Sequence, residues 1–109
     1  MNKILINGRI VGALHPKVTD KGQVWMPFRL KNTHRGRDGK DHFVTVGCVA
    51  FGKCAQFIAE QFQENSPIMI HGKLNYRSYK TADGVMGDRL EILVSSYDAP
   101  NAGYGENNA

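Results

Sequence analysis

The chain has 109 residues, 41% of them hydrophobic and 22% charged, which suits one globular domain and leaves no room for a second. No apolar run approaches the roughly 18 residues of a membrane span, and the N-terminus lacks the apolar stretch of a signal peptide. We therefore expect a cytoplasmic protein. The two cysteines, Cys48 and Cys54, fit neither a disulfide framework nor a metal-ligand pattern, so no metal or cofactor is expected.

The net charge of +4 is distributed unevenly along the chain. Residues 1–57 hold ten lysines and arginines against three acidic residues, whereas residues 58–109 hold four against seven. The first half therefore offers a basic surface to a polyanion, although such charge can also serve solubility alone.

Three stretches of the first half alternate apolar and polar residues, a period of two that predicts strands with one buried face. These stretches are residues 3–10, 24–31 and 43–51. Gly8 indicates a bulge or tight bend, and Pro27, which cannot donate a hydrogen bond to a ladder, indicates an edge or bulge. Residues 32–42 are polar and glycine-rich, which predicts a basic loop.

The period changes after Gly52. Cys54, Phe57, Ile58 and Phe62 follow helical spacing and predict a short amphipathic helix. Alternation returns in residues 68–75 and 90–94, which predict two more strands joined through a hairpin turn at residues 82–84. Residues 96–109 have no periodicity and predict a flexible tail.

The predicted order of elements is β-β-β-α-β-β within a domain of residues 1–95. An all-β domain with one short helix between the third and fourth strands is the arrangement of the five-stranded OB fold, a Greek-key barrel. Such barrels hold oligonucleotides on the face of their second and third strands and in their loops.

Four stretches of the chain carry a resemblance to bacterial and phage single-stranded-DNA-binding proteins, which spans about residues 2–95. The stretches are Asn2–Ile10; Pro16, Thr19, Gly22, Phe28 and Leu30; Val49–Ala55; and Ile70–Leu74 with Arg77-Ser78-Tyr79, Asp83-Gly84 and Glu91–Val94. The resemblance implies a homo-oligomer, usually a tetramer with a dimer also open, that coats single-stranded DNA in replication, recombination or repair.

Two features depart from the family pattern. Thr45 and Gly36 stand where the family often has tryptophans. The end of the chain, Gly-Glu-Asn-Asn-Ala, differs from the acidic tip with a terminal Phe that recruits repair enzymes in bacterial members. This difference counts against recruitment by that route and favours a phage or plasmid origin.

Binding without sequence preference requires aromatic rings for the bases and cations for the phosphates. Phe51 matches a stacking residue of the family, although it could instead pack under the helix. Tyr79 follows Arg77-Ser78 at an aromatic position of the family. Trp25 is expected to stack or to contact another subunit, and Phe43 shares the parity of Phe51 but could pack at the end of its strand.

The cations fall into three groups. Lys53 and Arg77 match basic positions of the family. The remaining candidates for phosphate binding are Arg35, Arg37 and Lys40 in the predicted basic loop, followed by Arg9, Lys31 and Lys73.

We therefore expect a protein that binds single-stranded DNA and is not an enzyme, since its acidic residues are scattered and converge on no site. One alternative is a primosome-type OB accessory protein that acts mainly through protein contacts. Another is an RNA-binding cold-shock-type module, because an OB surface alone does not separate RNA from DNA.

Overall fold

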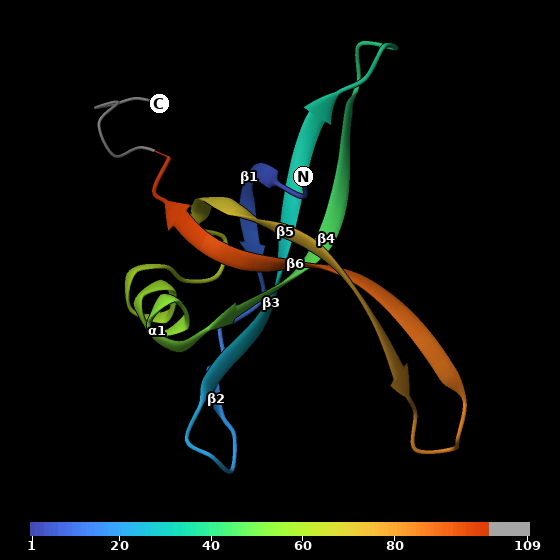
Figure 1. Ribbon diagram of the computed structural model, residues 1–109. Coiled ribbons are helices and arrows are strands. Elements are labelled where there is room, and N and C mark those ends of the chain that lie inside the picture. The colour runs from blue at the N-terminus through green and yellow to red at the C-terminus, as the bar shows by residue number, and fades with distance from the viewer. Residues whose placement is uncertain (101–109) are drawn as a thin grey trace.

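Over residues 1–100, which are the residues that the computed structural model describes, the chain forms six strands and one helix (Figure 1). In chain order these are β1 (Ile4–Val11), β2 (Lys17–Val18), β3 (Val24–Arg35), β4 (Asp41–Phe51), α1 (Gly52–Gln61), β5 (Pro67–Lys80) and β6 (Met86–Asp98).

The five long strands close into a barrel because β1 pairs at both of its edges. The first part of β1 pairs with β5, and its last residues pair with β3, so the strand order β1-β5-β6-β4-β3 returns to β1. β4 and β6 pair in parallel, and every other pair is antiparallel among the described strands. The predicted OB barrel, with its helix between the third and fourth long strands, is thereby confirmed.

Two glycines allow the backbones to approach where the barrel bends. A Cβ atom at Gly8 would overlap the carbonyl oxygen of Lys31, and one at Gly72 would overlap the carbonyl oxygen of Leu93. The register of β5 against β6 shifts between His71 and Gly72, as expected at a bulge. Pro27 lies where β3 has no second partner, between the residues paired with β2 and those paired with β1.

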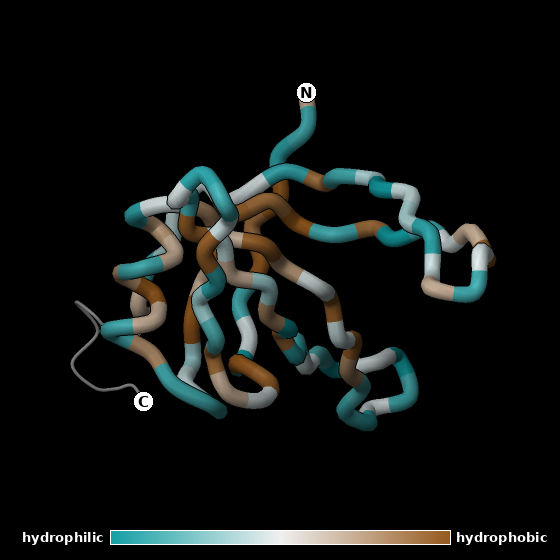
Figure 2. Tube along the Cα trace, turned by 90° about the horizontal axis from the view of Figure 1, so that it is seen from below, coloured by the Kyte–Doolittle hydropathy of each residue, from teal (hydrophilic) through white to brown (hydrophobic). Residues whose placement is uncertain are grey.

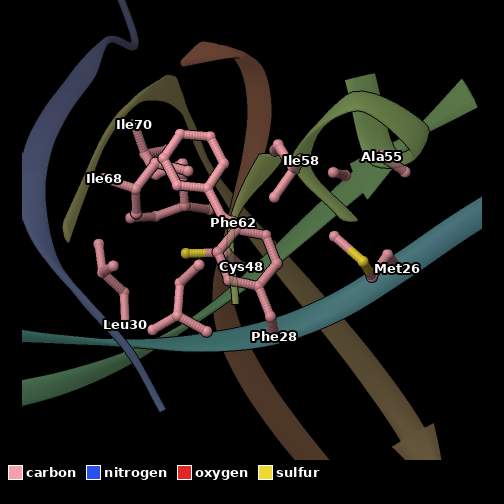
Figure 3. Close-up of a cluster of buried hydrophobic side chains, with 12 residues drawn as sticks. Met26, Phe28, Leu30, Cys48, Ala55, Ile58, Phe62, Ile68 and Ile70 are labelled. Atoms are coloured by element: carbon pink, nitrogen blue, oxygen red, sulfur yellow. The ribbon is translucent and has the colours of Figure 1, made fainter. Parts of the chain in front are cut away.

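The apolar residues that alternate along the strands meet inside the barrel, where α1 covers one end (Figures 1 and 3). The buried core consists of Ile10, Met26, Phe28, Leu30, Cys48, Ala50, Ala55, Ile58, Phe62, Ile68, Ile70 and Ile92. Figure 2 shows the hydrophobic segments gathered in the body of the barrel. From the helix, Ala55 and Ile58 enter the core, while Phe57, one of the residues whose spacing predicted the helix, is 45% exposed.

The hairpins are longer than the sequence pattern predicts. The basic loop predicted at residues 32–42 shrinks to residues 36–40, because β3 continues to Arg35 and β4 begins at Asp41. β5 and β6 likewise extend to Lys80 and from Met86, and both hairpins project from the barrel (Figure 1). In these arms the strands are held together by backbone hydrogen bonds, and neither face is buried. Their sequence therefore lacks the alternation of apolar and polar residues that predicts a strand.

The barrel also ends later than the predicted boundary at residue 95. Residues 96–98 pair with residues 69–71 of β5, and the ring of Tyr97 packs edge-on against Phe62 with the centroids 5.6 Å apart. Residues 101–109 of the predicted tail lie outside the described residues. No helix of the described part is long and apolar enough to cross a membrane.

Candidate nucleic-acid interface

The odd-numbered residues of β3 and β4 share one surface, here called the outer face. Successive side chains of a strand point to opposite sides, and within the barrel the even-numbered residues, from Val24 to Leu30 and from Val46 to Ala50, face the core. Cross-strand partners lie on the same side, so the register places three predicted stacking residues on the outer face. These residues are Trp25, Phe43 and Phe51.

Trp25 at the start of β3 and Phe51 at the end of β4 lie side by side on the outer face, and this pair is here called the two-ring platform. They are direct cross-strand partners, and the Cβ atoms of such partners lie roughly 4.5–5.5 Å apart. Phe51 is 43% exposed and Trp25 is partly buried. Phe51 therefore points outward rather than under the helix, and its stacking role stays a prediction.

Ammonium groups already lie beside two of the rings. The Nζ atom of Lys31 is 4.3 Å from the ring centroid of Phe43, and that of Lys17 is 5.1 Å from the ring of Trp25. Contacts of this kind are cation–π interactions.

The outer face continues onto β6 and β5. The parallel register pairs Gly47 of β4 with Glu91, and the antiparallel register pairs Arg77 with Arg89 and Tyr79 with Gly87. Tyr79, Arg77 and Lys73 therefore lie on the same surface as the two-ring platform. The ring of Tyr79 occupies the space that the missing side chain of Gly87 leaves open, and it is 41% exposed.

The other predicted cations lie at the margins of this face. Lys53 is exposed in the first turn of α1, two residues after Phe51. Arg9 is the cross-strand partner of Lys31, and its Nη1 donates a hydrogen bond of 2.9 Å to the carbonyl oxygen of Asn65. This hydrogen bond ties Arg9 to the segment that follows the helix. Arg9 and Lys31 also line a cavity of about 820 Å³ beside β1.

The tip of the β3–β4 arm carries compensating charge. Arg35 lies 3.6 Å from Asp41, which partly neutralises it. Two hydrogen bonds to the Asp38 carboxylate lower its pKa. The larger effect comes from the backbone N–H of Lys40, and the smaller one comes from the side chain of His42. Asp38 therefore stays ionised and offsets part of the charge of Arg37 and Lys40 in the same loop.

Three further cations of this surface are not among the sequence-predicted site residues. Arg29 and Arg89 lie on the outer face, and Lys17 lies beside Trp25 on β2. Arg29 could have been predicted, because it lies on the same side of the strand predicted at residues 24–31 as Trp25 does. Lys17 and Arg89 fall in segments for which the sequence predicts no strand.

The thiols offer no reactive nucleophile. Burial raises the pKa of the Cys48 thiol to about 12 and also raises that of Cys54, which keeps both groups protonated near neutral pH. Within residues 1–100, no three His, Cys, Asp or Glu side chains come together in a way that could hold a metal ion.

A closed five-stranded barrel whose outer face presents aromatic rings between cations defines an OB-type nucleic-acid-binding protein. The model of the Single-strand binding protein family matches residues 1–99, and the chain belongs to this family. The resemblance drawn from the sequence is thus confirmed.

Relatives from bacteria and one solved structure agree with this family. A single-stranded DNA-binding protein of Fusobacterium nucleatum is 28% identical over 96% of this chain and 77% of its own length. One of Clostridium perfringens is 26% identical over 96% of this chain and 69% of its own length. The structure of a Plasmodium falciparum SSB in complex with ssDNA superposes with a TM-score of 0.78 at 20% identity, covering 90% of this chain and 91% of that one. At this identity the likeness concerns the fold.

Proposed function

We propose that this chain binds single-stranded DNA without sequence preference along the outer face, and so coats and protects it during replication, recombination or repair. The observation that carries the proposal is that Trp25, Phe51, Phe43 and Tyr79 lie on the same side of four connected strands, with cations on that side as well. Rings stack on any base, and cations follow the phosphates of any sequence.

The roles are divided by residue type. The four rings take bases. Phosphates are taken by the predicted cations, namely Lys53, Arg77, Lys73, Lys31, Arg9, Arg35, Arg37 and Lys40, and we add Lys17, Arg29 and Arg89 because they lie on or beside the outer face. The family match supports a binding role without catalysis. The primosome-type alternative is not favoured, since both bacterial relatives described above are named single-stranded DNA-binding proteins. A cytoplasmic location stays a prediction.

Titration with poly-dT tests this function. Trp25 is the only tryptophan and belongs to the two-ring platform, so a stacked base is expected to quench its fluorescence. Poly-dT should bind far more tightly than a duplex of equal length, whose bases are already stacked, and a matched RNA competitor measures the preference for DNA. Equal binding of duplex and single strand would contradict the proposal.

We further propose that the protein is a homo-oligomer, with a tetramer expected and a dimer possible. The side of the β5–β6 arm opposite the outer face exposes apolar residues, namely Leu74, Tyr76, Met86 and Leu90. Tyr76 and Leu90 are cross-strand partners, 58% and 60% exposed, and a second copy of the chain would bury them.

Light scattering measures this assembly. A tetramer should have four times the mass of the 12.1 kDa chain, and Leu90→Glu should lower the mass because it places a charge in the interface. Phe57→Glu, on the exposed side of α1, is the matched control and should leave the mass unchanged. A wild-type mass of one chain would contradict the proposal.

A further inference from the structure

One acidic side chain is buried within the basic outer face. Glu91 is 3% exposed and is the one buried charged residue among those the structure describes. Its Oε1 atom has no hydrogen-bond partner within the described residues, and the Nη2 atom of Arg77 lies 3.4 Å away. Burying an ionised carboxylate is strongly unfavourable unless a cation compensates it, so Arg77 is the group that makes this burial tolerable.

The position of Glu91 is unusual for a surface that attracts a polyanion. It pairs with Gly47 on one side and with Asn75 on the other, and Arg29 lies beyond Gly47 as the next residue across the sheet. A cavity of about 630 Å³ opens over Gly47 and is lined by Arg29, Arg89 and Glu91. By Coulomb's law alone, a carboxylate at this place would repel DNA.

Arg77 has two distinct environments. One side of its guanidinium faces the buried carboxylate, yet the side chain is 49% exposed, so N–H groups remain for a second partner. A guanidinium carries five donors in a rigid fork, which allows it to hold a carboxylate and a phosphate together. Anchoring one edge removes rotamer freedom that would otherwise be lost when DNA binds.

We infer that Glu91 is a positioning residue for DNA binding, which acts by anchoring Arg77 so that its free edge points at a backbone phosphate. The inference rests on the proposed function. It explains why an acidic group is kept under a basic face: the benefit of an ordered guanidinium exceeds the repulsion of a carboxylate that Arg77 neutralises.

The test is Glu91→Gln, because its direction opposes simple electrostatics. Removing a negative charge should tighten DNA binding if only charge matters. Loss of the anchor should instead weaken poly-dT binding by about three- to tenfold, because DNA binding must then order the Arg77 side chain. The slope of log affinity against log salt should also become shallower by up to about 0.7, the value for one phosphate on a single strand. Asp88→Asn is the matched control, an exposed acid on the same strand with opposite parity, and should bind as tightly as the wild type or more tightly.

A double-mutant cycle separates positioning from general damage. If Glu91 acts through Arg77, adding Glu91→Gln to Arg77→Gln should weaken binding no further. This comparison also decides the matter if Glu91→Gln alone fails to fold, because the double variant removes both charges of the pair.

The inference is overturned if Glu91→Gln binds more tightly, keeps the wild-type salt slope, or weakens binding further in the Arg77→Gln background. A wild-type protein that ignores poly-dT would instead refute the proposed function.

Discussion

Replacing Phe51 with alanine is expected to weaken binding of poly-dT by about tenfold or more while leaving the fold intact, because stacking contributes roughly 1–3 kcal/mol per base. Phe51 is 43% exposed and is not part of the core cluster, so its loss leaves no buried cavity. Its cross-strand partner Trp25 remains to report binding by fluorescence.

Phe57→Ala is the matched control for this experiment. Phe57 has almost the same exposure, 45%, but lies on α1 rather than on the outer face. The control should bind poly-dT like the wild type. If both variants lose the same affinity for poly-dT, or if Phe51→Ala loses none, the two-ring platform is not part of the interface. Tyr79→Ala would then show whether bases stack on the β5–β6 side.

Replacing Gly72 with alanine is expected to cost about 1–3 kcal/mol of the free energy of unfolding, as overpacking in a filled site does. The added Cβ would overlap the carbonyl oxygen of Leu93 and approach the side chain of Ile92, and a backbone atom cannot move aside as a flexible side chain can. The melting temperature should fall by about 4–8 °C for each kcal/mol in a domain of this size.

Gly47→Ala is the control for this effect, since both glycines lie within strands and neither has a positive φ. A Cβ at Gly47 would meet nothing within 4 Å. Thermal unfolding should therefore leave Gly47→Ala at the wild-type temperature or slightly above it, because alanine reduces the entropy of the unfolded chain. Similar melting temperatures for the two variants would show that Gly72 is not needed for the bend of β5.

The central part of the fold could be predicted from local pattern. Ile6, Phe28, Cys48 and Ile70 lie in stretches of period two, and this period exists because one side of each strand faces the core. The change to helical spacing after Gly52 marks α1 for the same reason. The outward direction of Phe51 followed from parity, since the neighbours on its strand fill the barrel.

The arms and the site depended on long-range pairing. Residues 32–35 and 86–89 form strands because a partner strand supplies their backbone hydrogen bonds, and their side chains record no buried face. For this reason the sequence pattern did not predict Arg89 and Lys17 as residues of the site. The burial of Glu91 beside Arg77 likewise follows from the register of β6 against two strands distant in sequence.

The sequence by itself thus determined which side of each strand is apolar, because that property repeats every second residue. Only the tertiary structure decided that Trp25, Phe51, Arg77 and Tyr79 share one face. The cause is physical: parity is a local property of one strand, whereas register is set by hydrogen bonds between strands that the closing barrel brings together.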